Sequence, residues 1–463
     1  MQVNKSIWTA IFGSVLLIAC GGGGGGSSNT NTSTVNIQTY FRDPSIVFSV
    51  PVSSTNITAV PTVTLPTNGS TDFVDLPVDV QGYQSTWYPI TAADTLSNIQ
   101  VGMYPVQTIN SKPNFMKGII PHDAGGVLND VYNNGYFPST WDRIKYTVSG
   151  NTVVYADSAI MHQFDMVNNL ITMGGDFFPP DSTVIDMGNL ARARNLNFMM
   201  MVGFYPGDAN VSSFYSNIYT IPSTDTQFWD AFFAAYKTVL LNRASLAVST
   251  GATHLAIGFN MGYLVNKGNA RWTDLINSVR NIGYQGKISY FSGTNHAWNE
   301  FVGMSDADKN SFIQLFDEIG FSVNSATIPA NAGDLLKTEE NINSIKDFFN
   351  FHINSIKTAN VPIVVMIATA STHGNLISGD YVEPGTSCSN TQITDYQQQA
   401  DVYEAAAEVI NGTTAVSGLL SWGYAYRNNM TTQINPNDAC YKNSASVRGK
   451  QAEAVLKYWF NGW

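Results

Sequence analysis

The chain has 463 residues, of which 44% are hydrophobic, 12% aromatic and 12% charged. This hydrophobic content can build a large core and excludes a globally disordered chain. The 23 basic and 34 acidic residues give a net charge of −11, which argues against nucleic acid as a partner, because that ligand requires clustered Lys and Arg. A low-charge, aromatic-rich chain suits uncharged ligands such as sugars, and equally suits an extracellular protein with a plain polar surface.

Residues 1–19 predict an export signal. Lys5 supplies the positive charge, and residues 7–18 form an apolar stretch too short for a transmembrane helix. The signal ends in Leu-Ile-Ala directly before Cys20, which resembles a bacterial lipobox. Residues 20–35 follow as a lipidated cysteine and a Gly/Ser/Thr tether. The resemblance implies lipidation at Cys20, with the membrane as a partner, on the outer membrane or cell surface of a Gram-negative bacterium.

The other two cysteines are Cys388 and Cys440. Two cysteines in an oxidising compartment most simply pair, and this disulfide would close a loop of about 50 residues. The six His residues are scattered and show no zinc-ligand spacing, and the chain has no P-loop, dinucleotide-binding glycine motif or G-x-S-x-G. We therefore expect a disulfide, no metal and no cofactor.

Residues 36–111 predict a small β-rich module. They are rich in Val, Thr, Ser and Pro, and the segments 60–65 and 73–80 alternate like half-buried strands interrupted by prolines. The sequence does not indicate whether this module binds a ligand or only spaces the following domain from the membrane.

From residue 112 to 463 the pattern predicts an α/β domain, a (β/α)8 TIM barrel, in which apolar strands alternate with amphipathic helices. A doubly wound open sheet is the alternative. We treat residues 121–166 as an insertion, with a hairpin over 143–155. The expected strands are 115–120, 167–173, 198–204, 254–260, 287–291, 318–323, 361–367 and 418–422. The clearest helix-period segments are 226–249, 270–282, 338–357, 394–410 and 446–460.

An ordered series of segments resembles a known group of enzymes over about residues 170–463. The series resembles barrel glycoside hydrolases of the clan with catalytic glutamates on strands four and seven, nearest to families acting on β-mannan and galactan. Its members are 181–200 (second helix into strand three), 253–260 (strand four), 271–290 (the next helix and strand), 361–365 (strand seven) and 418–422 (strand eight).

Both glutamates implied by this resemblance are missing. The acid/base position at the end of strand four is Asn260, or Met261 in a second register. The nucleophile position, about five residues after Pro362, is Ile367, followed by Ala368. Glycoside hydrolysis normally requires two carboxyl groups, so the standard chemistry is expected to be lost.

In such a barrel, ligands bind at the carboxyl ends of the strands. Trp422 is the leading candidate, because the resembling enzymes place a sugar-stacking aromatic residue there. The full set of expected ligand-binding residues is Tyr205, Asn260, Tyr263, Trp298, Asn324, Trp422 and Tyr424.

Carboxylates elsewhere could replace the missing pair. Asp176 after the second expected strand and Glu383 after the seventh are the candidate catalytic residues. Asp317 and Glu318 begin strand six, so we expect them at the opposite end of the barrel.

These observations leave three functions open. The first is a lipid-anchored protein whose degenerate barrel binds a polysaccharide or oligosaccharide without cleaving it. The second is an active glycosidase that uses Asp176 and Glu383. The third is a structural or assembly lipoprotein with the barrel as scaffold. The sequence identifies neither the glycan nor any protein partner.

Overall fold

A computed structural model describes the following residues: 33–36, 46–47, 49–52, 62–63, 104, 107–122, 136–165, 167–168, 170–175, 179–207, 214, 217–218, 221–259, 261–265, 267–293, 301, 304–324, 338–372, 374–378, 396–425, 443–448 and 450–463.

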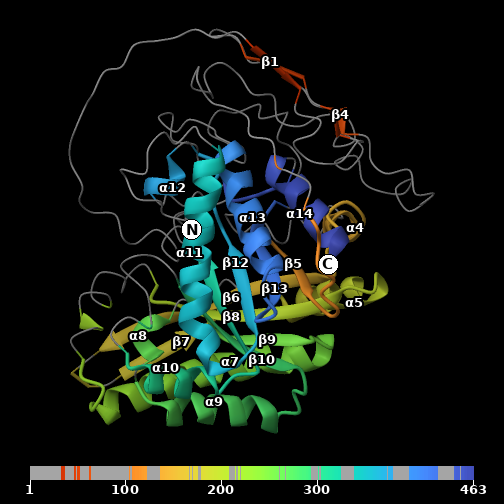
Figure 1. Ribbon diagram of the computed structural model, residues 1–463. Coiled ribbons are helices and arrows are strands. Elements are labelled where there is room, and N and C mark those ends of the chain that lie inside the picture. The colour runs from red at the N-terminus through yellow and green to blue at the C-terminus, as the bar shows by residue number, and fades with distance from the viewer. Residues whose placement is uncertain are drawn as a thin grey trace.

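Eight parallel strands form a closed barrel (Figure 1). Each strand pairs with the next around the ring, and β13 pairs with β5 to close it. This closure confirms the (β/α)8 fold and excludes the open sheet. The barrel strands are β5 (Met116–Pro121), β6 (Thr152–Asp165), β8 (Asn197–Tyr205), β9 (His254–Phe259), β10 (Lys287–Gly293), β11 (Glu318–Val323), β12 (Ile363–Ile367) and β13 (Val416–Tyr424).

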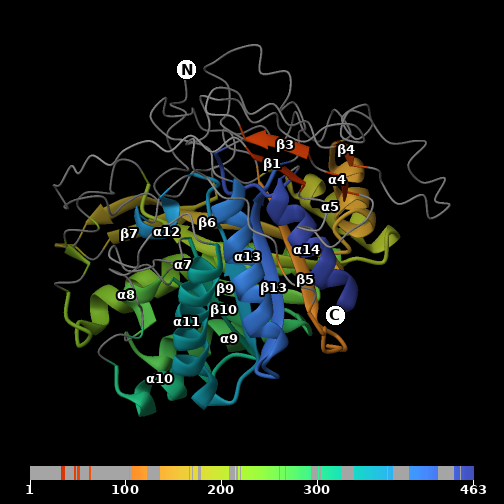
Figure 2. The same ribbon diagram turned by 45° about the horizontal axis from the view of Figure 1, so that its top comes forward.

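Helices surround the barrel, and Figure 2 shows α11, α13 and α14 side by side over β12, β13 and β5. The five helix-period segments are confirmed to within a few residues. No helix in the described ranges combines the length and apolarity that a bilayer crossing requires. The main helices are α4 (Tyr136–Tyr146), α5 (Asp181–Ala193), α7 (Thr226–Thr250), α9 (Asn269–Asn281), α10 (Asp306–Ile313), α11 (Thr338–Ile356), α13 (Tyr396–Asn411) and α14 (Gln451–Gly462). Short helical turns are α8 (Gly262–Val265), η2 (Lys357–Ala359) and α12 (Asn375–Ser378).

The second barrel strand differs from our prediction. It is β6, which pairs in parallel with β5 and β8, whereas β7 (Leu170–Gly174) is antiparallel to β6. Three predictions are therefore wrong: the insertion at 121–166, which holds α4 and β6, the hairpin over 143–155, and the placement of strand two at 167–173. The expected hairpin turn is the connection from α4 to β6, where the Asn151 side chain bonds to the backbone of β5 and holds the new strand beside it.

The described part of the N-terminal region contains two short antiparallel pairs. β1 (Ser33–Asn36) pairs with β3 (Ser49–Val52), and β2 (Ile46–Val47) pairs with β4 (Thr62–Val63). Most of the expected module, including segment 73–80, lies outside the described residues, and the domain boundaries remain predictions.

Residues 107–112 form a strap on the helices of the barrel. The Asn110 backbone N–H donates to Asn411 Oδ1 at 2.8 Å, and the Asn110 side chain donates to the Asn411 carbonyl at 2.9 Å. Lys112 Nζ donates to the Thr413 carbonyl at 2.6 Å. The strap therefore joins the chain that precedes β5 to the end of α13.

The core has two layers because alternate strand residues face opposite sides of the sheet. Outward residues pack under the helices as an outer cluster. Inward residues fill the barrel as an inner cluster, which consists of Met116, Ile120, Val154, Met199, Met201, Ala256, Phe259, Phe291, Val364, Met366, Ala368, Leu420 and Trp422.

Gly320 makes room for one ring of the inner cluster. A Cβ on Gly320 would lie 2.2 Å from Cδ1 of Phe291. We expect Gly320→Ala to lower the free energy of unfolding by about 1–3 kcal/mol, the usual cost of overpacking a core. Urea denaturation of the two proteins measures this difference. Gly412→Ala is the control, since its nearest neighbour would be the Val409 carbonyl oxygen at 3.5 Å. Equal losses in both variants would contradict the packing argument.

Candidate functional site

Four of the expected ligand residues lie at the carboxyl ends of the barrel strands within the described ranges. Tyr205 ends β8, Asn324 follows β11, Trp422 lies near the end of β13 and Tyr424 ends that strand. All four are buried, with 4% of Trp422 exposed.

Trp422 faces the barrel axis and contacts two other rings at this end. Phe259 is stacked on it, with ring centroids 5.8 Å apart and an interplanar angle of 22°. His122 lies 5.5 Å away at 35°. Sequence reasoning did not select His122, although a polar residue two positions after the expected strand 115–120 was a usable signal.

His122 is held electrically neutral at this position. Its backbone N–H donates to the Tyr424 carbonyl at 2.9 Å, which joins the ends of β5 and β13. Burial of the ring lowers the pKa of His122 to about 4. At neutral pH the ring is therefore an uncharged imidazole with one donor and one acceptor nitrogen.

A β-bulge changes which residues of β9 face the axis. Ala256 faces inward and Ile257 outward, but a Cβ on Gly258 would also point outward, 2.6 Å from the Tyr290 ring. The pairing register with β10 shifts at this point. Phe259 consequently faces inward and joins the inner cluster.

Met261 is fully buried in the outer cluster. It therefore does not lie at an axis-facing position, which weakens the second register of the resemblance. Asn260 lies outside the described residues, so its placement at the position of the family's acid/base glutamate stays a sequence prediction.

The end of strand seven presents a methyl group to the axis. Val364, Met366 and Ala368 belong to the inner cluster, whereas Ile367 belongs to the outer one. Of the two residues at the expected nucleophile position, Ala368 is the inward one, and neither can ionise.

Tyr424 is fully buried in the outer layer and offers no surface to a ligand. Gly423, with a φ of 89°, lies where the β13–β5 register shifts, and it turns Tyr424 away from the axis. The Tyr424 hydroxyl donates to Glu453 Oε1 at 2.6 Å and accepts from Arg143 Nε at 2.5 Å. Burial raises the pKa of Tyr424, so the phenol stays protonated inside this ion-pair cluster.

Two side-chain oxygens just after β11 and β12 are buried and, within the described part of the chain, unsatisfied. Asn324 Oδ1 and Thr369 Oγ1 have no hydrogen-bond partner among the described residues. Asn324 is 5% exposed and Thr369 is fully buried. Unsatisfied buried oxygens are costly, and a hydroxyl-bearing ligand or water can satisfy both.

The remaining site predictions lie outside the described residues. They concern Asp176, Asn260, Trp298, Glu383, Cys20, Cys388, Cys440 and the side chain of Tyr263. Asp176 follows the antiparallel β7, not barrel strand two, which removes the reason for placing it at a strand end. Within the described ranges, no three His, Cys, Asp or Glu side chains are grouped to hold a metal ion.

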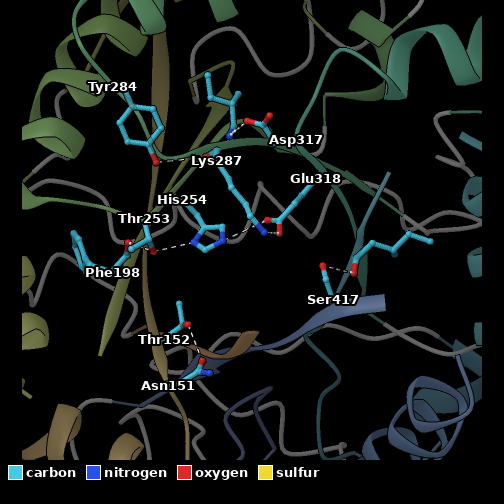
Figure 3. A network of polar contacts seen from close by, with 12 residues as sticks. Asn151, Thr152, Phe198, Thr253, His254, Tyr284, Lys287, Asp317, Glu318 and Ser417 are labelled. Carbon is cyan, nitrogen blue, oxygen red and sulfur yellow. Dashed lines mark hydrogen bonds and ion pairs between the residues drawn. The ribbon is translucent and has the colours of Figure 1, made fainter. Parts of the chain in front are cut away.

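A second polar cluster lies at the amino ends of the strands (Figure 3). Glu318 pairs with Lys287 and lies 3.5 Å from His254 Nε2, whose Nδ1 is 2.8 Å from Thr253 Oγ1. Burial raises the pKa of Glu318, and burial followed by the Lys287 charge lowers that of His254 to about 4. The structure confirms that Asp317 and Glu318 face away from the ligand end, where polar contacts stabilise the barrel.

Comparison with known proteins gives a family match and a set of similar folds. The model of Glycoside Hydrolase Family 113 matches residues 155–443. A solved GH113 β-1,4-mannanase superposes with a TM-score of 0.54 at 16% identity, over 75% of this chain and 98% of that chain. A GH113 β-mannanase from Alicyclobacillus acidocaldarius, in complex with ManMIm, gives 0.52 at 17%, over 75% and 97%. No curated protein sequence matches the chain.

The pKa of His122 predicts a pH-dependent stability. Between pH 6.5 and 4 the unfolded chain binds a proton on His122 that the folded chain does not, so stability falls as the pH is lowered through this window. From pH 7 to 4 the wild type should lose about 2–3 kcal/mol more unfolding free energy than His122→Phe. Urea denaturation at both pH values measures the difference. The two proteins share all other titrating groups, so these contribute equally to both losses. Equal losses would show that His122 titrates normally.

Proposed function

The chain belongs to glycoside hydrolase family 113, and we propose that its barrel binds a polysaccharide or oligosaccharide without the two-glutamate hydrolysis. The family match and the barrel fold support carbohydrate as the ligand class. The similar structures are named as β-mannanases, so a β-1,4-linked mannan is the proposed ligand.

One observation carries the loss of hydrolysis. The nucleophile position on strand seven holds Ile367 and Ala368, of which Ala368 faces the axis, and Met261, the acid/base position in one register, is buried in the outer cluster. Alkyl and thioether groups can neither protonate a leaving oxygen nor attack a sugar. Their positions support a binding site without the standard pair of carboxyl groups.

The other described groups at this end suit a neutral, hydroxyl-rich ligand. Trp422 has an apolar ring suited to the CH face of a sugar, and the His122 ring beside it is uncharged. Asn324 and Thr369 contribute the two oxygens without partners. Each of these groups is uncharged, which matches a neutral glycan.

We expect the wild type to bind β-1,4-mannan oligosaccharides in isothermal titration calorimetry and to release no reducing sugar from mannan. Trp422→Ala should weaken binding at least tenfold, about 1.4 kcal/mol. Trp463→Ala is the control, because Trp463 packs on Phe115 at the amino end of β5. Circular dichroism confirms that both variants are folded.

Other outcomes select the remaining functions. Sugar release that Asp176→Asn or Glu383→Gln abolishes would establish a glycosidase with relocated carboxylates. Absence of both binding and release across a glycan panel would favour a structural or assembly protein.

We also propose that lipid at Cys20 anchors the protein to the outer membrane, with residues 20–35 as the tether. The lipobox-like sequence before Cys20 supports this location. In a Gram-negative host, wild-type protein should fractionate with outer membranes and incorporate labelled palmitate. Cys20→Ser should lose the label and leave the outer-membrane fraction. Unlabelled wild-type protein would overturn the proposal.

A further inference from the structure

Trp422, the residue expected to stack on a sugar, is already stacked with a side chain of this protein. Trp422 is 4% exposed, and Phe259 is equally buried. Their rings are nearly parallel, at 22° and 5.8 Å between centroids. A pyranose ring stacks on tryptophan in a similar parallel arrangement, through its apolar CH face. Phe259 thus lies where a bound sugar ring would be expected.

Local backbone geometry places this ring. In a regular strand, the alternation that starts at Ala256 would point Gly258 inward and Phe259 outward. The bulge instead turns both Ile257 and Gly258 outward, so Phe259 faces the axis. The Phe259 ring reaches Trp422 because Ile257 and Gly258 both face outward. Its position therefore depends on this bulge and not on the regular alternation of the strand.

We propose that Phe259 is an internal competitor for the Trp422 face, which a sugar must displace to bind. This inference rests on the proposed carbohydrate binding at the same site. When only a fraction of molecules has Phe259 turned away, the apparent affinity equals the intrinsic affinity multiplied by that fraction. Phe259 therefore sets the affinity of the site, and its removal strengthens binding.

The test compares two phenylalanines of the inner cluster. Phe259→Ala should bind mannan oligosaccharides about five- to tenfold more tightly than wild type in calorimetry. Phe291→Ala is the matched control, because Phe291 is also buried in this cluster but packs against Gly320. It should leave the affinity within about twofold, even where its melting temperature falls. Phe259→Leu, which keeps apolar volume but lacks a flat ring, replaces the alanine variant if that variant fails to fold.

A ligand-free measurement tests the covering itself. Acrylamide should quench tryptophan fluorescence more strongly in Phe259→Ala than in wild type, and the increase should vanish in the double variant with Trp422→Phe. No increase in quenching would overturn the proposal.

The binding outcomes separate this inference from the proposed function. A wild type that binds, with Phe259→Ala no tighter, overturns the competitor and leaves carbohydrate binding intact. A Phe259→Ala variant that binds when the wild type does not supports the competitor and overturns binding by the native protein. Absence of binding in both overturns both proposals.

Discussion

Pairing of β13 with β5 is the contact on which the rest of the molecule depends. It joins the last strand to the first through partners such as Gly418 with Met116 and Ser421 with Ile119. Once the sheet is closed, each strand has one face toward the axis and one toward the helices. The two separate hydrophobic clusters follow from this division.

The candidate site lies where strict alternation ends. At Gly258 two successive residues face outward, and at Gly423 a positive φ accompanies a register shift. The first irregularity brings Phe259 onto the axis, and the second sends Tyr424 to Arg143 and Glu453. Irregular backbone at the strand ends thus determines which aromatic rings can reach a ligand.

Seven of the eight barrel strands could be predicted from the sequence, because short apolar runs between amphipathic helices are a strong local signal. Strand two could not, because the Ser149-Gly150-Asn151 connection has the composition of a hairpin turn. Trp422 was correctly placed at the carboxyl end. The outward turn of Tyr424 and the inward turn of Phe259 depend on bulges, which residue alternation alone does not predict. Asn260, Asp176 and Glu383 lie outside the described residues, so their roles remain predictions.

The strap at residues 107–112 has a mechanical consequence. A pull on the chain before residue 107 reaches the Asn110–Asn411 pair and the Lys112–Thr413 bond before it reaches β5. Tension on the chain that precedes β5 is therefore partly transferred to the end of α13. The hydrogen bonds between β5 and β13 do not carry all of it. The contacts of the strap lie outside the barrel wall, so the helical layer bears such a load before the strands do.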